Sequence, residues 1–529
     1  MIMRLEGRVC EKAPVVLVLS WIVLLHLWCF YSAGALWRDE SNSILQARLP
    51  RWEMIWASLE FDSFPILYPA ALRLWSALPL GCGDLSLRLF GLCTGLVVLA
   101  SIWVIGRLTS GHVPLICFAL VAADPVLISE GDSIRPYGIS MLCLLWAFGF
   151  FTRYVSRPSA LSLSYAALAS VLAVQASYIN ALFIGVFCMC AALIAARRDT
   201  RSDNWKVFLP GLAAAVSLLP YTKTLRNGST WASLLHSRID WYSFLQRYLK
   251  AHSPVYLTIW LVSVLFIVFM IFKGRRDQRG RQGPRSTTTA YTILTAVVCA
   301  IVLTLFVEAT GVPPFPRYFL PGAILLALAL ESVIADVRPG AKGIVTVAAL
   351  LVAAVPTWNW LSQRHTNMDR VTAVIEQSAR PGDLIVISPW FLHTSFQRYY
   401  GGAVEWCTVP DLDRYPMMRY DLVKNAIIRG GSQEKVSQRL HAALDRGGAV
   451  WFIAQRAWVQ LDRHEAPEPL PRVSVPRGQD YVSFRSYWER DIEFRLRACC
   501  QGVEAGLPHR GQAWEEEDLI LTRWSAGAR

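Results

Sequence analysis

The feature that most constrains this chain is a series of long apolar runs. The first, from Pro14 to Leu36, is long enough to cross a bilayer, which requires about 20 residues. Further runs lie at 86–106, 113–129, 137–154, 160–176, 180–196, 206–221, 254–273, 290–309, 317–335 and 343–360. In a chain that is 54% hydrophobic and 17% charged, so much apolar surface requires lipid as well as a protein core. The sequence therefore predicts a polytopic α-helical membrane protein with about 11 transmembrane helices.

Basic residues between these runs predict the orientation of the chain. If the runs alternate in direction, the following basic residues fall on one side: Arg4, Arg8, Lys12, Arg107, Arg153, Arg157, Arg197, Arg198, Arg201, Lys206, Lys273 through Arg285, Arg338 and Lys342. The positive-inside rule then places the N-terminus in the cytoplasm, and an odd number of helices places the C-terminal region outside. The same rule accounts for the net charge of +13 without a nucleic-acid partner.

The composition changes near residue 361, where charges and prolines become regular and membrane-length apolar runs end. Helical spacing appears at 368–379 and 434–446, and strand-like runs appear at 383–388, 449–454 and 518–523. We therefore expect a soluble extracytoplasmic α/β domain over 361–529. It follows a transmembrane domain over 1–360, which includes a first outer loop at 37–85 with interfacial amphipathic helices. No dinucleotide or P-loop motif is present.

The twelve cysteines show no zinc-ligand or redox spacing, and most lie in or near apolar runs. Cys407, Cys499 and Cys500 instead lie in the polar C-terminal region. If this region is outside the cytoplasm, a disulfide between Cys407 and either member of the pair can form.

Polar residues that carry chemistry gather in the predicted outer loops. Asp39 and Glu40 come directly after the first apolar run, and Asp62 lies later in the same loop. A solvated helix end is the simpler interpretation of such an acidic pair.

Two arginines at predicted outer helix starts run against the positive-inside trend. Arg135 precedes Tyr137, and Arg317 precedes Tyr318. Because a guanidinium binds phosphate oxygens through two donors, the arginines could hold the phosphate of a lipid-linked donor. Alternatively, each arginine reaches the membrane surface or pairs with Glu130 or Asp132.

Three histidines and one further aspartate have mainly structural roles as their expected interpretation. His365 and His393 lie near aromatic residues of the C-terminal region, where either acceptor contact or ordinary packing is expected. His26 in the first apolar run is expected to be a packed polar residue. Asp124, followed by Pro125, is expected to end a helix near the outer side, where it could support Arg135.

Taken together, these segments resemble the GT-C glycosyltransferases, in particular the dolichyl-phosphate-mannose protein mannosyltransferase and aminoarabinose transferase group. The resemblance covers most of 14–360: an acidic pair after the first helix, a D-x-H-P-P-L-Y-like stretch at 62–68, an R-P-Y motif at 135–137 and an R-Y motif at 317–318. Phe64 and Ile66 depart from that stretch, where the family often has His or Lys and a second Pro. Bacterial relatives also carry an outer C-terminal α/β domain.

The resemblance implies an inverting transfer of a sugar from a polyprenyl-phosphate donor to a protein, lipid or glycan acceptor at the outer face of the plasma membrane. Asp39 would be the catalytic base, with Glu40 and Asp62 orienting the acceptor. The departing phosphate would be bound by Arg135, Tyr137, Arg317 and Tyr318. We expect neither a cofactor nor a metal ion.

Two other classes of function use the same kind of ligand. A transporter or flippase of lipid-linked sugars would bind the phosphate without chemistry, but such proteins usually show repeated halves and broken helices at mid-membrane. A surface polysaccharide polymerase or ligase would share the donor. The crowding of polar residues on one face favours the transferase.

Overall fold

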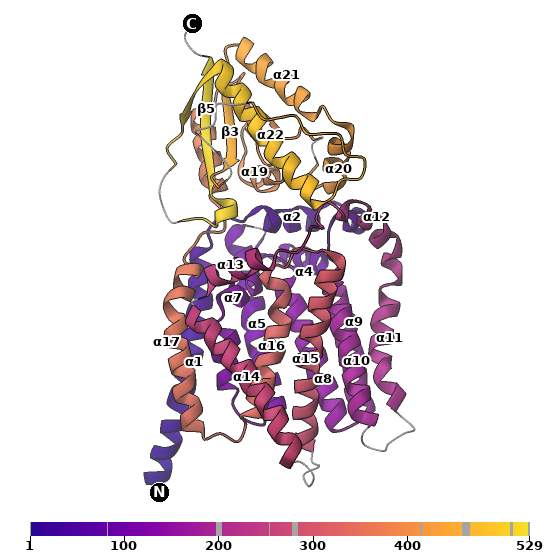
Figure 1. The fold of residues 1–529 in the computed structure, drawn as a ribbon. Helices are drawn as coiled ribbons and strands as arrows, with labels where there is room; N and C mark the ends of the chain where they lie inside the picture. Colours follow the sequence, from indigo (N-terminus) through magenta and orange to yellow (C-terminus); the bar gives the residue numbers. More distant parts are fainter. Residues whose placement is uncertain are drawn as a thin grey trace. The chain divides into compact units, whose positions relative to one another are not determined.

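The computed structural model of the chain describes residues 2–81, 83–196, 204–252, 254–277, 284–412, 415–457, 466–507 and 512–526. It forms two compact units (Figure 1). The helical unit comprises Met1–Tyr31, Ser63–Thr222 and Ile239–Ser362, and the mixed unit comprises Ser32–Asp62, Lys223–Arg238 and Gln363–Arg529. The division predicted at residue 360, with all of 37–85 in the membrane domain, stays a prediction.

The helical unit is built from long helices connected by short ones. Its helices are α1 (Ile2–Ser32), α4 (Leu67–Ser76), α5 (Asp84–Ser110), α6 (Leu115–Cys117), η2 (Phe118–Ala122), α7 (Pro125–Gly131), α8 (Tyr137–Ser156), α9 (Ala160–Ala176), α10 (Asn180–Ala196), η3 (Asn204–Phe208), α11 (Leu209–Ser217), η4 (Leu219–Tyr221), α13 (Trp241–Ala251), α14 (Pro254–Asp277), α15 (Pro284–Thr310), α16 (Pro316–Val333) and α17 (Pro339–Leu361).

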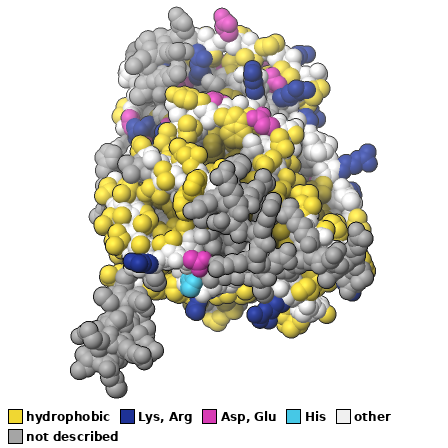
Figure 2. All heavy atoms as spheres, turned by 60° about the horizontal axis from the view of Figure 1, so that its bottom comes forward, with side chains coloured by type: hydrophobic (Ala, Val, Ile, Leu, Met, Phe, Trp, Pro, Cys, Tyr) yellow, Lys and Arg dark blue, Asp and Glu magenta, His cyan; other side chains and the backbone are white. Residues whose placement is uncertain are grey.

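Within the described ranges, six helices are long and apolar enough to cross a membrane, or seven if the bent pair formed by α13 and α14 counts as one span. Two shorter apolar helices, α9 and α10, accompany them. Hydrophobic side chains cover much of the visible surface of this unit, as a chain surrounded by lipid requires (Figure 2). The chain is therefore a multi-pass membrane protein, and the predicted total of about 11 spans stays a prediction.

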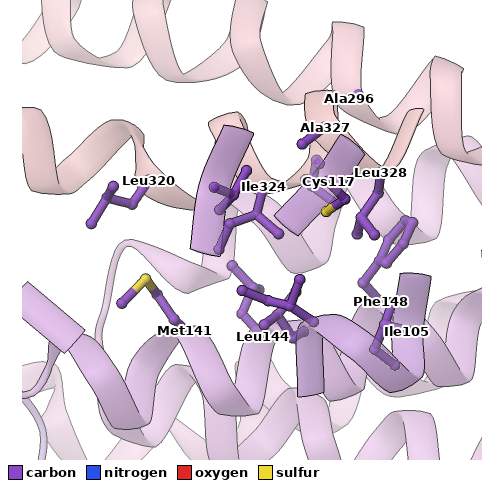
Figure 3. Packing of buried hydrophobic residues seen from close by; sticks show 14 of the residues in the cluster. Ile105, Cys117, Met141, Leu144, Phe148, Ala296, Leu320, Ile324, Ala327 and Leu328 are labelled. Atoms are coloured by element: carbon purple, nitrogen blue, oxygen red, sulfur yellow. The ribbon is translucent and has the colours of Figure 1, made fainter. Parts of the chain in front are cut away.

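The core of the helical unit is apolar and tightly packed. Met141, Leu144 and Phe148 of α8 face Ile324 and Leu328 of α16 (Figure 3). All five side chains are at most 3% exposed, so these helices contact one another rather than lipid.

The apolar run at 113–129 does not form one continuous helix. A short α6 passes into the π-helical η2, and the chain then breaks at Asp124 before α7 begins with Pro125. The proline has no N–H to continue the preceding helix, while the Asp124 carboxylate accepts from the first free amides of α7. The expected helix end at Asp124–Pro125 is confirmed.

The mixed unit surrounds a five-stranded sheet with the order β2-β1-β3-β5-β4. The strands are β1 (Leu384–Ile387), β2 (Glu405–Thr408), β3 (Val450–Gln455), β4 (Cys500–Glu504) and β5 (Leu519–Ala526). Its helices are α2 (Arg38–Ala47), α3 (Trp52–Ser58), η1 (Leu59–Phe61), α12 (Thr222–Ala232), α18 (Met368–Ser378), η6 (Trp390–Leu392), α19 (His393–Tyr399), α20 (Tyr420–Arg429), α21 (Ser432–Asp445), α22 (Gly478–Cys499) and η7 (Glu515–Glu517). β1 pairs in parallel with β2 and β3, and β5 runs antiparallel to β3 and β4.

The predicted helices and strands of the C-terminal region are confirmed as α18, α21, β1, β3 and β5, within a few residues at each end. The suggested disulfide is wrong. β2, which carries Cys407, and β4, which begins with Cys500, form opposite edges of the sheet, and none of the three cysteines is in a disulfide. The sequence could not reveal this separation, because strand order is set by packing.

Some basic residues used to predict orientation lie outside the described residues. They are Arg197, Arg198, Arg201, Arg279 and Arg281.

Candidate functional site

Asp39 and Glu40 lie in the first turn of α2, in the mixed unit. Glu40 is completely buried: its carboxylate accepts from the Trp37 amide at 3.3 Å and lies 3.3 Å from His365 Nδ1. The Asp39 side chain is 22% exposed, 3.7 Å from Arg38 Nε. Glu40 therefore holds the start of the helix in place, whereas Asp39 is accessible to a reactant.

Arg38 connects this turn to the end of the chain. Its guanidinium donates to Glu517 Oε1 at 2.7 Å and to Glu516 Oε2 at 3.2 Å, and it stacks over Phe391 at 4.4 Å. Burial by itself lowers the pKa of Arg38, but the carboxylates of Glu517, Asp39 and Glu516 raise it above its ordinary value. Burial raises the pKa of Glu517 to about 7, although Arg38 lowers it. Arg38 is thus a permanent cation beside Asp39.

Two contacts fix the position of α2 within the mixed unit. The Asn42 side chain accepts from the Met418 amide at 2.8 Å, and Thr394 of α19 donates to the Arg38 carbonyl at 2.9 Å. His365 stacks on Trp514 at 4.0 Å and is 3% exposed. His365 therefore has a packing role, which is one of the two roles that the sequence predicts for it.

His393 also has a packing role. It is 6% exposed, and its Nδ1 donates to the Trp390 carbonyl at 2.8 Å. Burial lowers the pKa of His393, so its imidazole is held in the neutral form.

The second group of predicted residues meets in the helical unit. Arg135 directly precedes the Pro136 cap of α8, and Arg317 lies in the first turn of α16. Their guanidinium carbons lie 5.9 and 5.3 Å from the centre of the Tyr137 ring, and Arg317 also lies 5.8 Å from the Tyr318 ring. The fold thus brings together two motifs that lie about 180 residues apart in the sequence.

Aromatic rings and one carboxylate complete this cationic cluster. Arg135 lies 5.0 Å from the Phe64 ring, and Arg317 lies 4.4 Å from the Phe315 ring. Glu130 Oε1 accepts from Arg317 Nη1 at 3.3 Å, as one predicted alternative stated. Phe64, where the family often has His or Lys, contributes a ring face to Arg135 instead of a polar atom. Two guanidinium groups and the Glu130 carboxylate therefore lie together among these aromatic rings.

Buried carboxylate–imidazole pairs fix both ends of α7, which carries Glu130. At its start, Asp124 Oδ2 lies 2.8 Å from His252 Nε2. Just after its end, Asp132 lies 2.9 Å from His26 Nδ1. This confirms His26 as a packed polar residue, and it gives Asp124 a histidine partner.

Two glycines of α5 allow Asp132 to come this close to the helix. A Cβ atom on Gly91 would lie 1.9 Å from the Asp132 carbonyl oxygen, and one on Gly95 would lie 1.7 Å from Asp132 Oδ1. Only glycine fits at these positions, because a side chain on Gly91 would displace the Asp132 backbone and one on Gly95 would displace its carboxylate.

The structure therefore gathers the predicted residues into two groups. The mixed unit contains Asp39, Glu40 and Asp62. The helical unit contains Arg135, Tyr137, Arg317 and Tyr318. That the two groups act on one substrate stays a prediction. No role was predicted for Glu516, Glu517 or His252, although the run of three glutamates at 515–517 is visible in the sequence.

Among the described residues, no group of three His, Cys, Asp or Glu side chains could hold a metal ion. The expectation that the reaction needs no metal stays a prediction.

Comparison with known proteins identifies the fold. The chain is similar to ArnT from Cupriavidus metallidurans bound to undecaprenyl phosphate, with 12% identity, a TM-score of 0.52 and coverage of 97% of this chain and 98% of ArnT. ArnT in the apo state matches with 13% identity, a TM-score of 0.41 and coverage of 84% and 93%. The oligosaccharyltransferase of Archaeoglobus fulgidus, in complex with Zn and sulfate, matches with 10% identity, a TM-score of 0.47 and coverage of 83% and 68%.

No protein-family model matches the chain, and no curated protein matches its sequence. The similarity to the first ArnT structure therefore identifies a shared fold, and the GT-C resemblance drawn from the motifs is confirmed at that level.

Proposed function

We propose that the protein is an integral membrane glycosyltransferase that moves a sugar from a polyprenyl-phosphate donor to an acceptor, with inversion at the anomeric carbon. The observation that carries this proposal is the cluster of Arg135 and Arg317 around Tyr137, built at two helix starts of a GT-C fold. The ArnT structure that shares this fold binds undecaprenyl phosphate, which supports a donor of that class.

The chemistry of the two groups fits an inverting displacement. Asp39 accepts the proton of the acceptor hydroxyl as that oxygen attacks the anomeric carbon, and the bond from this carbon to the donor phosphate breaks. Arg135 and Arg317 stabilise the negative charge that grows on the departing phosphate, with Tyr137 and Tyr318 beside them. Glu40 and Asp62 orient the acceptor, Glu40 by fixing the helical turn that presents Asp39.

The membrane orientation is part of the proposal. The basic connections lie in the cytoplasm together with the N-terminus, and the C-terminal region lies outside the inner membrane. The polyprenyl chain then stays in the bilayer while its head reaches the outer face. Partners are the lipid-linked donor, membrane lipid and an acceptor of protein, lipid or glycan type.

Donor turnover by purified protein tests the proposal. The full chain in lipid nanodiscs is incubated with labelled undecaprenyl-phosphate sugars and candidate acceptors, and the anomeric configuration of the product is read by NMR. We expect Asp39→Asn to lower kcat by a factor of about 100 to 10,000. Asp369→Asn is the matched control, because Asp369 also neighbours an arginine, Arg364, at 2.7 Å.

The phosphate-binding residues have their own test. We expect Arg317→Gln to lower kcat by a factor of about 100 to 1,000, since it removes one charged donor to the leaving group. Arg153→Gln, an exposed arginine in the last turn of α8, is the control. Full activity of Asp39→Asn would remove the base assignment. Donor movement across the bilayer without any transfer would instead identify a flippase, and chain extension of a glycan would identify a polymerase.

A further inference from the structure

A large cavity lies at the far end of the helical unit from the arginine cluster. Its volume is about 1200 Å³, above the roughly 300–1,000 Å³ of pockets for small soluble ligands. It is bounded by the segment after α5, the connection between α16 and α17, and the first turns of α17. The 18-residue α16 separates it from Arg317, which corresponds to about 27 Å of helix. The cavity and the cluster are therefore about one bilayer thickness apart.

The walls of this cavity are mainly apolar. They are formed by Val15, Val113, Leu115, Ala335, Val337, Ile344, Val347, Ala348 and Leu351. Water-filled pockets for polar metabolites need more hydrogen-bonding groups than such walls provide, so the cavity favours hydrocarbon.

An exposed apolar strip continues from the cavity along α17. Ile344, Leu351 and Val355 are 74%, 70% and 67% exposed, and Val347 between them is 38% exposed. Their spacing of three and four residues places them on one face of the helix. From Ile344 to Val355 the strip is about 16 Å long. This matches one leaflet of a hydrocarbon core about 30 Å thick, which is the reach of a phospholipid acyl chain.

The polar residues of the cavity are few, and one cation, Arg338, and one carboxylate, Asp336, are exposed at its mouth. Arg338 is exposed, directly before the first turn of α17, whose positive helix end also faces this region. The space beside Gly340 is open, since a Cβ atom there would meet nothing within 4 Å. Asp336 contributes the one carboxylate among the lining residues, which also include the exposed His112.

The other cation among the lining residues is Lys342, whose side chain lies at the base of the cavity. It is 5% exposed and lies 3.4 Å from the buried Glu331 carboxylate. Glu331 also accepts from the amides of Ile116 and Cys117 at 2.9 and 3.1 Å, so its charge is compensated below the cavity. The mouth thus keeps Arg338 and the helix end available for an anion.

We propose that this cavity binds an anionic phospholipid of the leaflet opposite the arginine cluster, with its phosphate head near Arg338 and one acyl chain along Ile344, Val347 and Leu351. Apolar walls alone would accept any lipid, and Arg338 together with the positive start of α17 selects a negatively charged head. The site is independent of the proposed transferase reaction, because it lies at the other end of α16.

Native mass spectrometry of the full-length protein tests this site. Delipidated protein in detergent is titrated with dioleoyl phosphatidylglycerol or with dioleoyl phosphatidylcholine, and the bound fraction gives a Kd for each lipid. We expect phosphatidylglycerol to bind about fivefold more tightly, the contribution of roughly one cation near a lipid head. Arg338→Gln should abolish this preference, and Arg153→Gln at the same end of the unit should keep it.

A second pair of variants tests the acyl site. Ala348→Trp fills the cavity and should weaken binding of both lipids. Val345→Trp places the same side chain at an exposed position of α17 that does not line the cavity, and it should bind like wild type. Thermal unfolding of each variant checks that it is folded. Equal affinity of wild type for the two lipids, or a preference that survives in Arg338→Gln, would overturn the proposal. Displacement of phosphatidylglycerol by undecaprenyl phosphate would instead assign the cavity to the carrier lipid.

Discussion

At the residue scale, two adjacent carboxylates on one helical turn have opposite surroundings. Glu40 is completely buried between the Trp37 amide and His365, while Asp39 keeps contact with solvent beside Arg38. A base must reach the hydroxyl that it deprotonates, so accessibility favours Asp39 for that role. Glu40 acts through the backbone that carries Asp39.

A buried carboxylate elsewhere in the mixed unit predicts a pH dependence of stability. Glu489 of α22 is 2% exposed, and within the described ranges neither of its oxygens accepts a hydrogen bond. Burial raises its pKa to about 7 in the folded protein, although Arg485 lowers it. Its unfolded pKa is about 4.3. The folded state therefore holds the proton more tightly, and stability falls as the pH rises from about 4.3 to 7.

We expect Glu489→Gln to remove this dependence. The variant should gain about 1–3 kcal/mol of unfolding free energy over wild type at pH 8 and little at pH 4. Unfolding followed by tryptophan fluorescence between pH 4 and 8 measures the difference. Glu434→Gln, at an exposed glutamate of α21, is the control. Parallel curves for Glu489→Gln and wild type would show that Glu489 stays ionised in the fold.

At the element scale, α7 is a seven-residue helix with carboxylate–imidazole pairs at both ends. So short a helix has little stability of its own. His252 contacts an acceptor through each ring nitrogen, the Tyr248 carbonyl at 3.0 Å and the Asp124 carboxylate at 2.8 Å. Both nitrogens therefore carry hydrogen, and the pair joins α7 to the break between α13 and α14 by charge as well as by a hydrogen bond.

Removal of the Asp124 carboxylate should lower the free energy of unfolding by more than removal of an ordinary helix cap does. Asp124→Ala takes away both the cap of α7 and the partner of a buried imidazolium, and we expect a loss of about 3–5 kcal/mol. Ser159→Ala removes only the cap of α9, where the Ser159 hydroxyl accepts from the Ser162 amide, and should cost about 1 kcal/mol. The thermal unfolding midpoints of the two variants in nanodiscs measure the difference. Equal shifts would mean that the Asp124–His252 pair adds nothing beyond capping.

At the scale of the whole molecule, the orientation in the membrane decides which compartment supplies the acceptor. Cys499 is exposed at the end of α22 and adjoins Cys500, with 3.2 Å between the two sulfur atoms. If the C-terminal region is outside, a membrane-impermeant maleimide should reach Cys499 in intact cells.

Labelling of reduced thiols tests this orientation. We expect the full-length protein to be modified by the impermeant reagent before cell lysis, and the double variant Cys499→Ser/Cys500→Ser to lose most of that signal. Cys407 is 2% exposed, so Cys407→Ser should leave the labelling unchanged. Modification that appears only after lysis would reverse the proposed orientation.

The helical membrane architecture follows from local patterns in the sequence, because the length and hydropathy of an apolar run decide whether it is stable in a bilayer. The sequence also identified Arg135, Tyr137, Arg317 and Tyr318 as one group, since each pair begins a helix and such starts can meet at one end of a bundle. The strands at 383–388, 449–454 and 518–523 followed from equally local patterns.

The pairing of charged residues, in contrast, depends on how the chain packs in three dimensions. Glu40 pairs with His365 and Arg38 with Glu517, across separations of 325 and 479 residues that no local pattern encodes. The order of the sheet separated Cys407 from Cys500, and the break at Asp124 turned one predicted apolar helix into α6, η2 and α7. These outcomes depend on how elements pack, since burial fixes both the cost of a charge and the partner that offsets it.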